Sequence, residues 1–108
     1  MVWQFLTLIW LHFIADFLLQ SDKVATSKSS CTVTLGYHAL LYGAPFLFFG
    51  WQFALFNAAA HFAVDFITST FTTYFHINGK RHMFFVTIGL DQAVHMTVLI
   101  LSMQWLLI

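Results

Sequence analysis

Charged residues are scarce in this chain, and no glutamate is present. Of 108 residues only 7% are charged, with 4 Lys or Arg and 4 acidic residues, all of which are Asp. Because a soluble domain carries about 25% charged residues, we interpret the chain as an integral membrane protein. The net charge of zero and the lack of a basic run argue against nucleic acid binding.

Cysteine is almost absent as well. The single Cys31 excludes an internal disulfide and leaves no cysteine framework for a metal. Any metal site must then be built from His and Asp. Without glutamate, Asp or His would also have to supply a general base.

Apolar residues, in contrast, make up 60% of the chain, and its mean hydropathy is +0.82. A hydrocarbon core needs roughly 20 apolar residues to be crossed. The chain therefore predicts an all-α fold, a polytopic membrane protein in which residues 1–108 form a single domain of four transmembrane helices. The predicted helices are Val2 to Gln20, Thr32 to Phe49, Gln52 to His76, and Met83 to Ile108.

The few basic residues set the expected orientation. They lie in the first and third connections, so the positive-inside rule places these connections in the cytoplasm and both termini outside, across a bacterial inner membrane. Ser21 to Ser30 is expected to be a mobile cytoplasmic loop, whereas the segment around Gly50 predicts a tight turn. The basic residues are Lys23, Lys28, Lys80 and Arg81.

Small residues and proline carry further expectations for the bundle. Gly36, Gly43 and Gly89 are expected to allow close approach between helices. Pro45 is expected to kink the second helix. The first segment lacks a basic leader and a small-residue cleavage site, so we expect a retained helix rather than a signal peptide.

Seven ionisable residues interrupt the apolar segments, where such groups are costly. Six form three pairs four residues apart, which puts both members on one helix edge. Counted from the cytoplasmic ends, all seven share one slab of the membrane, so they are expected to converge. They are His12, Asp16, His38, His61, Asp65, Asp91 and His95.

A metal ion is the simplest reason for such convergence. Each mid-membrane Asp costs on the order of 2.5–3.5 kcal/mol, which a divalent cation would offset. Imidazole with carboxylate suits Zn, Mn, Fe, Co or Ni, so we predict that the seven residues ligate one or two such ions, zinc first. A structural or proton-relaying hydrogen-bond network is the alternative. His76 and His82 are expected to be ordinary loop residues.

An internal repeat supports the grouping. The string H-F-x-x-D-F occurs at His12 to Phe17 and again at His61 to Phe66, and Thr34 to His38 is echoed by Thr87 to Asp91. Two copies of a two-helix unit would be related by an approximate two-fold axis along the membrane normal.

The motifs also resemble a known family. The strings H-x-x-x-D-F-x-L-Q (His12 to Gln20), H-x-x-x-D (His61 to Asp65) and D-Q-x-x-H (Asp91 to His95) resemble those of small bacterial and phage membrane proteins grouped as a domain of unknown function. The resemblance covers almost the whole chain and implies four helices and the same site residues, but no reaction. A looser, architectural likeness is to intramembrane metal-dependent hydrolases, whose Ser-x-x-x-His and H-E-x-x-H strings are missing here.

The expected function is a metal-dependent hydrolase at the cytoplasmic side of the membrane, with Asp16, Asp65 and Asp91 as catalytic residues. The basic connections suit a lipid or phosphorylated substrate, and a homo-oligomer is compatible with the sequence. One alternative is a metal-ion or proton transporter, whose polar ladder should continue to the outer face. Another is a small modulatory protein whose bundle is stapled by metal.

Overall fold

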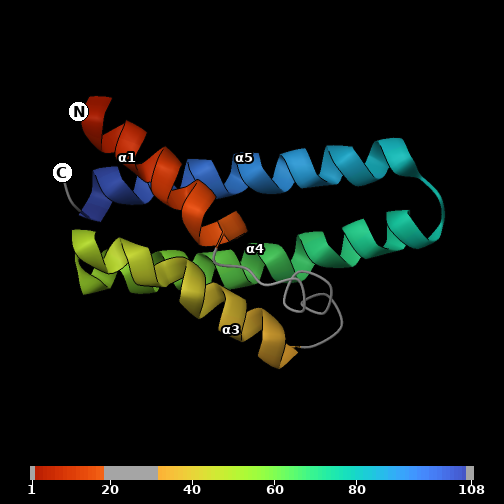
Figure 1. Cartoon of the computed structure of the whole chain (residues 1–108), viewed down its shortest axis with the longest axis horizontal. Helices are drawn as coiled ribbons and strands as arrows, with labels where there is room; N and C mark the ends of the chain where they lie inside the picture. Colours follow the sequence, from red (N-terminus) through yellow and green to blue (C-terminus); the bar gives the residue numbers. More distant parts are fainter. Residues whose placement is uncertain (1, 19–31, 107–108) are drawn as a thin grey trace.

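The computed structural model describes residues 2–18 and 32–106, and within these ranges the chain is helical, with no strand (Figure 1). The predicted Ser21 to Ser30 loop lies outside them, as do Lys23, Lys28 and Cys31. The all-α prediction is confirmed for the described part, and the four predicted helices agree with it to within a few residues. The elements are α1 (Val2–Phe13) with the π-helical turn η1 (Ile14–Leu18), α3 (Thr32–Gly43) with the 3-10 helix η2 (Ala44–Phe49), α4 (Trp51–Ile77) and α5 (Arg81–Leu106).

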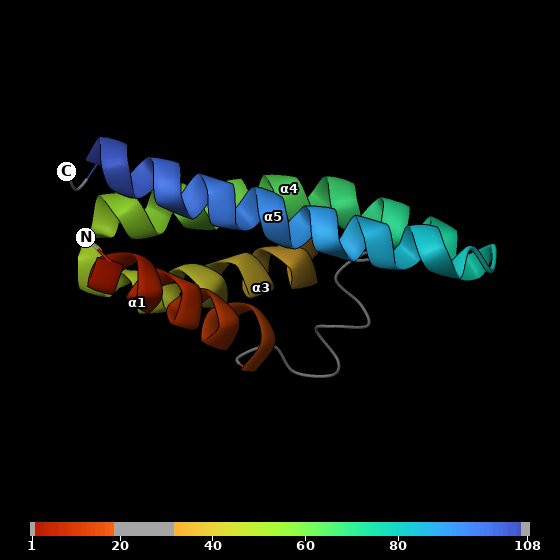
Figure 2. The ribbon, with the colours of Figure 1, turned by 90° about the horizontal axis from the view of Figure 1, so that it is seen from above.

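A long antiparallel hairpin of α4 and α5 carries the other two helices. With 27 residues, α4 is about 40 Å long at 1.5 Å per residue, close to the 44 Å length of the molecule. In both ribbon views α1 and α3 lie along the half of the hairpin near the termini and stop well short of its turn (Figures 1 and 2). The helices α1 and α4 run in one direction and α3 and α5 in the other.

Glycines with positive φ shape both described turns. Gly50, at φ 117°, is the only residue between η2 and α4, so the predicted tight turn is confirmed. Gly79, at φ 68°, follows α4, where its N–H donates to the His76 carbonyl (3.2 Å) and the Lys80 N–H donates to the Phe75 carbonyl (2.9 Å). This pair of bonds satisfies carbonyls that the helix end would otherwise leave exposed.

Pro45 ends the α-helical winding of α3. Its ring nitrogen has no N–H to donate to the carbonyl four residues earlier, and the chain continues from Ala44 as the 3-10 helix η2. The expected irregularity at Pro45 therefore takes the form of a change in helix type.

The described bundle buries a cluster of polar residues beside an apolar one and exposes many large apolar side chains. Large apolar side chains face outward, among them Phe48 (87% exposed), Val33 (82%) and Trp3 (79%), an arrangement opposite to that of a soluble protein. Two segments, Thr32–Phe49 and Arg81–Leu106, are long and apolar enough to cross a membrane. The buried polar residues are His12, Asp16, His38, Asn57, His61, Asp65, Ser69, Thr87, Asp91, His95 and Ser102.

Of the three glycines expected to allow close approach, only Gly43 does so tightly. A Cβ built on Gly43 would lie 2.8 Å from the Ala58 Cβ and 3.1 Å from the Ala54 carbonyl oxygen. At Gly36 the nearest neighbour is at an ordinary 3.8 Å, and nothing described lies within 4 Å of such an atom at Gly89. The prediction is therefore wrong for Gly89, whose side faces away from its neighbours.

Gly43→Ala should destabilise the bundle by about 1–3 kcal/mol, because the added methyl overpacks the crossing of α3 and α4. Gly89→Ala is the matched control and should be neutral or stabilising by up to about 1 kcal/mol, since alanine favours helix. Reversible unfolding of the purified protein in SDS–detergent mixtures measures both values. Equal stability of the two variants would contradict the close crossing.

Candidate metal centre

The seven ionisable residues of the apolar segments meet inside the bundle, as predicted. They come from each of the four helical segments, and their exposed fractions range from 0% to 9%. Every one contacts at least one other ionisable or hydrogen-bonding side chain of the cluster. The spacing and depth in the sequence thus point to the right region of the fold.

Four of these residues form the tightest part of the cluster, which we call the four-ligand group: Asp16, His38, His61 and Asp65. Its centre is the pair of Nε2 atoms of His38 and His61, which are 2.8 Å apart. Asp65 Oδ2 lies 3.3 Å from the first and 3.2 Å from the second. Asp16 Oδ1 lies 3.1 Å and 3.5 Å from the same two atoms.

These distances fit a tetrahedral metal ion. Donors placed 2.0–2.1 Å from zinc in a tetrahedron are separated by about 3.3 Å. The five separations that involve an Nε2 atom of the four-ligand group run from 2.8 to 3.5 Å. Hydrogen bonds alone serve them less well, because each Nε2 carries at most one proton and therefore cannot donate to all its neighbours at once. A central divalent cation interacts favourably with all four donors.

A second set of donors adjoins the first. The three-ligand group consists of Asp16, Asp91 and His95, whose ligand atoms lie within 4.8 Å of one another. His95 Nε2 is 3.2 Å from Asp91 Oδ1 and 3.1 Å from Asp65 Oδ1. Asp16 belongs to both groups, and Asp65, a member of the first, also contacts His95 of the second through its Oδ1.

His12 lies beside both groups and belongs to neither. Its Nδ1 is 2.8 Å from the Tyr42 hydroxyl, its Nε2 is 2.7 Å from Gln92 Oε1, and the Nε2 is 3.9 Å from Asp16 Oδ2. The structure thus brings His12 to the predicted site with both ring nitrogens engaged by neutral side chains.

Two hydrogen-bonding residues at the site are absent from the sequence prediction. Gln92 Nε2 donates to Asp16 Oδ2 (3.1 Å) and Asp91 Oδ2 (3.2 Å). The Thr68 hydroxyl lies 2.5 Å from Asp91 Oδ1. The sequence offers only weak signals for these two residues. Thr68 follows Asp65 by about one helical turn, and Gln92 stands inside the D-Q-x-x-H string.

Stacked rings fix the imidazoles. The Tyr42 ring lies nearly parallel to His61, with centroids 3.9 Å apart and an interplanar angle of 12°. His61 also stacks on His95 at 4.1 Å and 27°. One turn toward the termini, Asn57 donates to the Ser102 hydroxyl (3.0 Å). Ring packing therefore helps to orient the imidazoles of His61 and His95.

The π-helical turn η1 delivers Asp16 to this cluster. A π turn winds more widely than an α turn, and here two consecutive residues, Ala15 and Asp16, are both buried. Such turns occur often at functional sites.

Comparison with known families assigns the chain to one of them. Residues 4–108 match the family described as "Protein of unknown function (DUF3307)". The chain belongs to this family. The resemblance predicted from the sequence motifs is thereby confirmed. No curated protein and no solved structure matches the chain, so the chemistry of this DUF3307 protein must be argued from its own residues.

The fold of this DUF3307 chain is compatible with the predicted two-helix repeat, which stays a prediction. The two H-F-x-x-D-F strings lie on α1 and α4, which run in the same direction, and the other two helices run oppositely (Figure 1). The repeat pairs His38 with Asp91, and both lie in the cluster.

Loss of one donor from the four-ligand group should remove bound metal from the DUF3307 protein. His38→Ala and Asp65→Asn are each expected to weaken binding by more than about 100-fold, since even outer partners of a metal site are worth 10–100-fold. His76→Ala, at the exposed hairpin end, is the matched control and should bind as the wild type does. Elemental analysis of protein purified without chelator checks this, and wild-type protein without stoichiometric metal would refute the site.

Proposed function

We propose that this protein is a membrane-embedded, metal-dependent hydrolase. Its four helices span the bacterial inner membrane, and it binds one or two divalent transition-metal ions, zinc first. The supporting observation is the burial of three carboxylates and four imidazoles in one contacting cluster inside a bundle whose outer surface is apolar. The three-ligand group, with three protein donors, would be the site of the reaction.

The surface of the bundle supports insertion in a membrane. Trp3, Trp51 and Trp105 are 66–79% exposed and lie toward the end that holds the termini, at the level where indole rings favour the interface. The described basic residues Lys80 and Arg81 lie at the opposite end, at the hairpin turn. The positive-inside rule then places the turn in the cytoplasm and both termini outside.

The number of donors separates the two groups chemically. Four protein donors complete a tetrahedral site, whereas three leave a position for water or substrate. A divalent ion bound there would supply Lewis-acid activation of water and of the substrate. Asp16 and Asp65 face the imidazoles of the four-ligand group, and these contacts suit the role of metal ligands for both carboxylates.

Asp91 is best placed to act as general base. Its side chain is 13% exposed, against 5% for Asp16 and 3% for Asp65. Its Oδ1 would be the metal donor. Its Oδ2, which has a second lone pair beside the hydrogen bond from Gln92, would accept the proton that the attacking water loses as its oxygen bonds to the substrate, and then return a proton to the leaving group. Thr68 and Gln92 hold the carboxylate in place for both steps.

The polarity of the core supports access from the cytoplasm and argues against a path through the membrane. On the side of the termini the core closes with apolar side chains that include Leu8, Phe46, Phe53 and Met103. On the side of the hairpin turn the residues next to the cluster carry hydroxyls: the buried Ser69 and Thr87 and the half-buried Thr68. A transporter would need polar groups along the whole path, whereas the termini side carries the Asn57–Ser102 pair and is closed by these apolar side chains.

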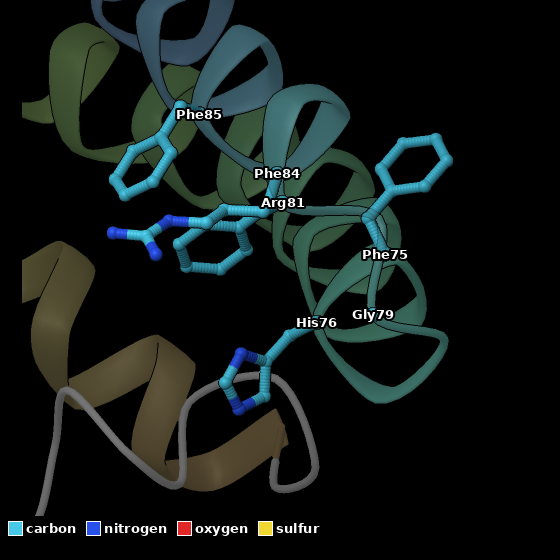
Figure 3. A pocket seen from close by; sticks show the side chains of 6 residues that line it. All are labelled: Phe75, His76, Gly79, Arg81, Phe84 and Phe85. Carbon is cyan, nitrogen blue, oxygen red and sulfur yellow. The ribbon is translucent and has the colours of Figure 1, made fainter.

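A pocket at the hairpin end suits a phosphate-bearing lipid. Its volume is about 470 Å³. Arg81 and His76 extend from the two helices toward the same side (Figure 3), and the Arg81 guanidinium lies 5.8 Å from the centroid of the Phe85 ring. Cations beside aromatic rings offer contacts for an anionic headgroup and its apolar chain. The lining residues are Phe75, His76, Gly79, Arg81, Phe84 and Phe85.

One specific observation favours a second candidate, a modulatory protein whose bundle is stapled by metal. The four-ligand group is complete without water, as structural zinc sites are. In that case bound metal should raise stability and support no turnover.

Asp91→Asn should separate the two functions. For a hydrolase, the variant retains metal in the four-ligand group but loses about 10²–10⁴-fold in kcat, because the general base is gone. The assay is release of product from anionic phospholipid or its soluble phosphoester analogue by protein in liposomes, before and after chelation. Metal-loaded wild-type protein that turns over none of these substrates would favour the staple.

The proposed orientation can be checked by labelling in cells. In a Cys31→Ser background, Val2→Cys should react with a membrane-impermeant maleimide added from outside. Asn78→Cys, at the hairpin turn, should react only after the membrane is permeabilised. The reverse pattern would contradict the positive-inside assignment.

A further inference from the structure

Gln92 lies between His12 and two carboxylates of the centre. Its Nε2 is 3.1 Å from Asp16 Oδ2 and 3.2 Å from Asp91 Oδ2, and its Oε1 is 2.7 Å from His12 Nε2. All the polar atoms of this amide are therefore engaged. The three partners come from α1 with η1 and from α5, so Gln92 ties these segments together.

Only one arrangement of protons suits these contacts. Turning the amide over would put its oxygen against the carboxylate oxygens of Asp16 and Asp91, which offer no proton when ionised. The NH₂ group must therefore face the two carboxylates. The oxygen then faces His12 Nε2, which has to carry the imidazole proton and donate it.

The same reasoning fixes the other side of His12. With the proton on Nε2, the Nδ1 atom of the neutral ring has a lone pair and accepts a hydrogen bond. The Tyr42 hydroxyl, 2.8 Å from Nδ1, is the donor. The result is a directed chain of hydrogen bonds from Tyr42 through His12 and Gln92 to the carboxylates, in which His12 has no lone pair left for a metal ion.

We infer that His12 and Gln92 act as positioning residues that make Asp16 and Asp91 bind metal through one oxygen each. Gln92 occupies Oδ2 of both carboxylates. The Oδ1 atoms face the imidazoles, 3.1 Å from His38 Nε2 for Asp16 and 3.2 Å from His95 Nε2 for Asp91. Asp91 Oδ1 also accepts a hydrogen bond from the Thr68 hydroxyl, and its second lone pair is the one available to a metal ion. This inference deepens the proposed metal-binding function and rests on it, and it moves His12 from the predicted ligands to the layer around them.

The proton order can be tested without metal. Nitrogen NMR of the ¹⁵N-labelled, metal-free full-length protein, with the ring of His12 assigned through bonds, should show a protonated Nε2 and a bare Nδ1. In Gln92→Leu this preference should weaken or disappear. Protonation at Nδ1 in the wild type would overturn the inference, whatever the protein does with metal.

The role in ligation is tested with Co²⁺ as a spectroscopic probe. Gln92→Leu should lower Co²⁺ affinity about 10–100-fold and reduce the intensity of its visible bands, because carboxylates freed at Oδ2 can chelate and raise the coordination number. Gln104→Leu is the matched control, since Gln104 is an exposed residue of the same helix away from the centre, and it should change neither. Wild-type affinity and spectrum in Gln92→Leu would overturn the inference.

X-ray absorption of the zinc-loaded protein tests His12 itself. His12→Asn should leave the number of imidazoles bound to zinc at its wild-type value. Loss of an imidazole in His12→Asn would make His12 a ligand and overturn its positioning role. Wild-type protein that takes up no zinc or cobalt refutes the proposed function instead, and the NMR result still decides the proton order.

Discussion

The electrostatic cost of placing carboxylates in an apolar bundle governs this structure. Asp16, Asp65 and Asp91 would together cost about 8–10 kcal/mol if ionised and alone in hydrocarbon. Each instead lies within 3.2 Å of an imidazole nitrogen. Because these imidazoles come from three different helices, satisfying the carboxylates also fixes how the helices pack. The polar cluster thus acts together with the apolar core around Phe46 and Phe53 in holding the helices in place.

The sequence predicts the location of the centre better than its internal order. Polar residues stand out in apolar segments, and their spacing by four places them on shared helix edges, so the seven residues and the helix bounds could be predicted. Thr68 and Gln92 could not, because neutral polar residues cost little in a helix and carry no comparable signal. Their importance lies in hydrogen bonds to carboxylates from other helices, and long-range pairing has no local pattern.

The repeated H-F-x-x-D-F string shows why local pattern falls short. In α4 the winding is α-helical, and the His61 and Asp65 side chains approach to 3.2 Å. In the first segment the winding widens to a π turn after Phe13, and the His12 and Asp16 side chains are 3.9 Å apart. Asp16 reaches the imidazoles of α3 and α4, while His12 reaches Gln92. The same sequence pattern thus has different roles in its two copies, because the pattern itself does not predict the change from α-helical to π-helical winding.

The helices that carry the carboxylates of the centre have unequal lengths, so these carboxylates lie at different distances from the helix ends. Asp16 lies two residues from the described end of η1, whereas Asp65 and Asp91 lie near the middle of α4 and α5. Among the described residues, the bundle therefore narrows from four helices to two immediately beyond the carboxylates (Figure 2). A lipid lying against the exposed Ile67 and Phe71 would meet this step from the side, within the plane of the membrane. Under the proposed function, such a lipid would approach the centre without a channel through the full thickness of the protein.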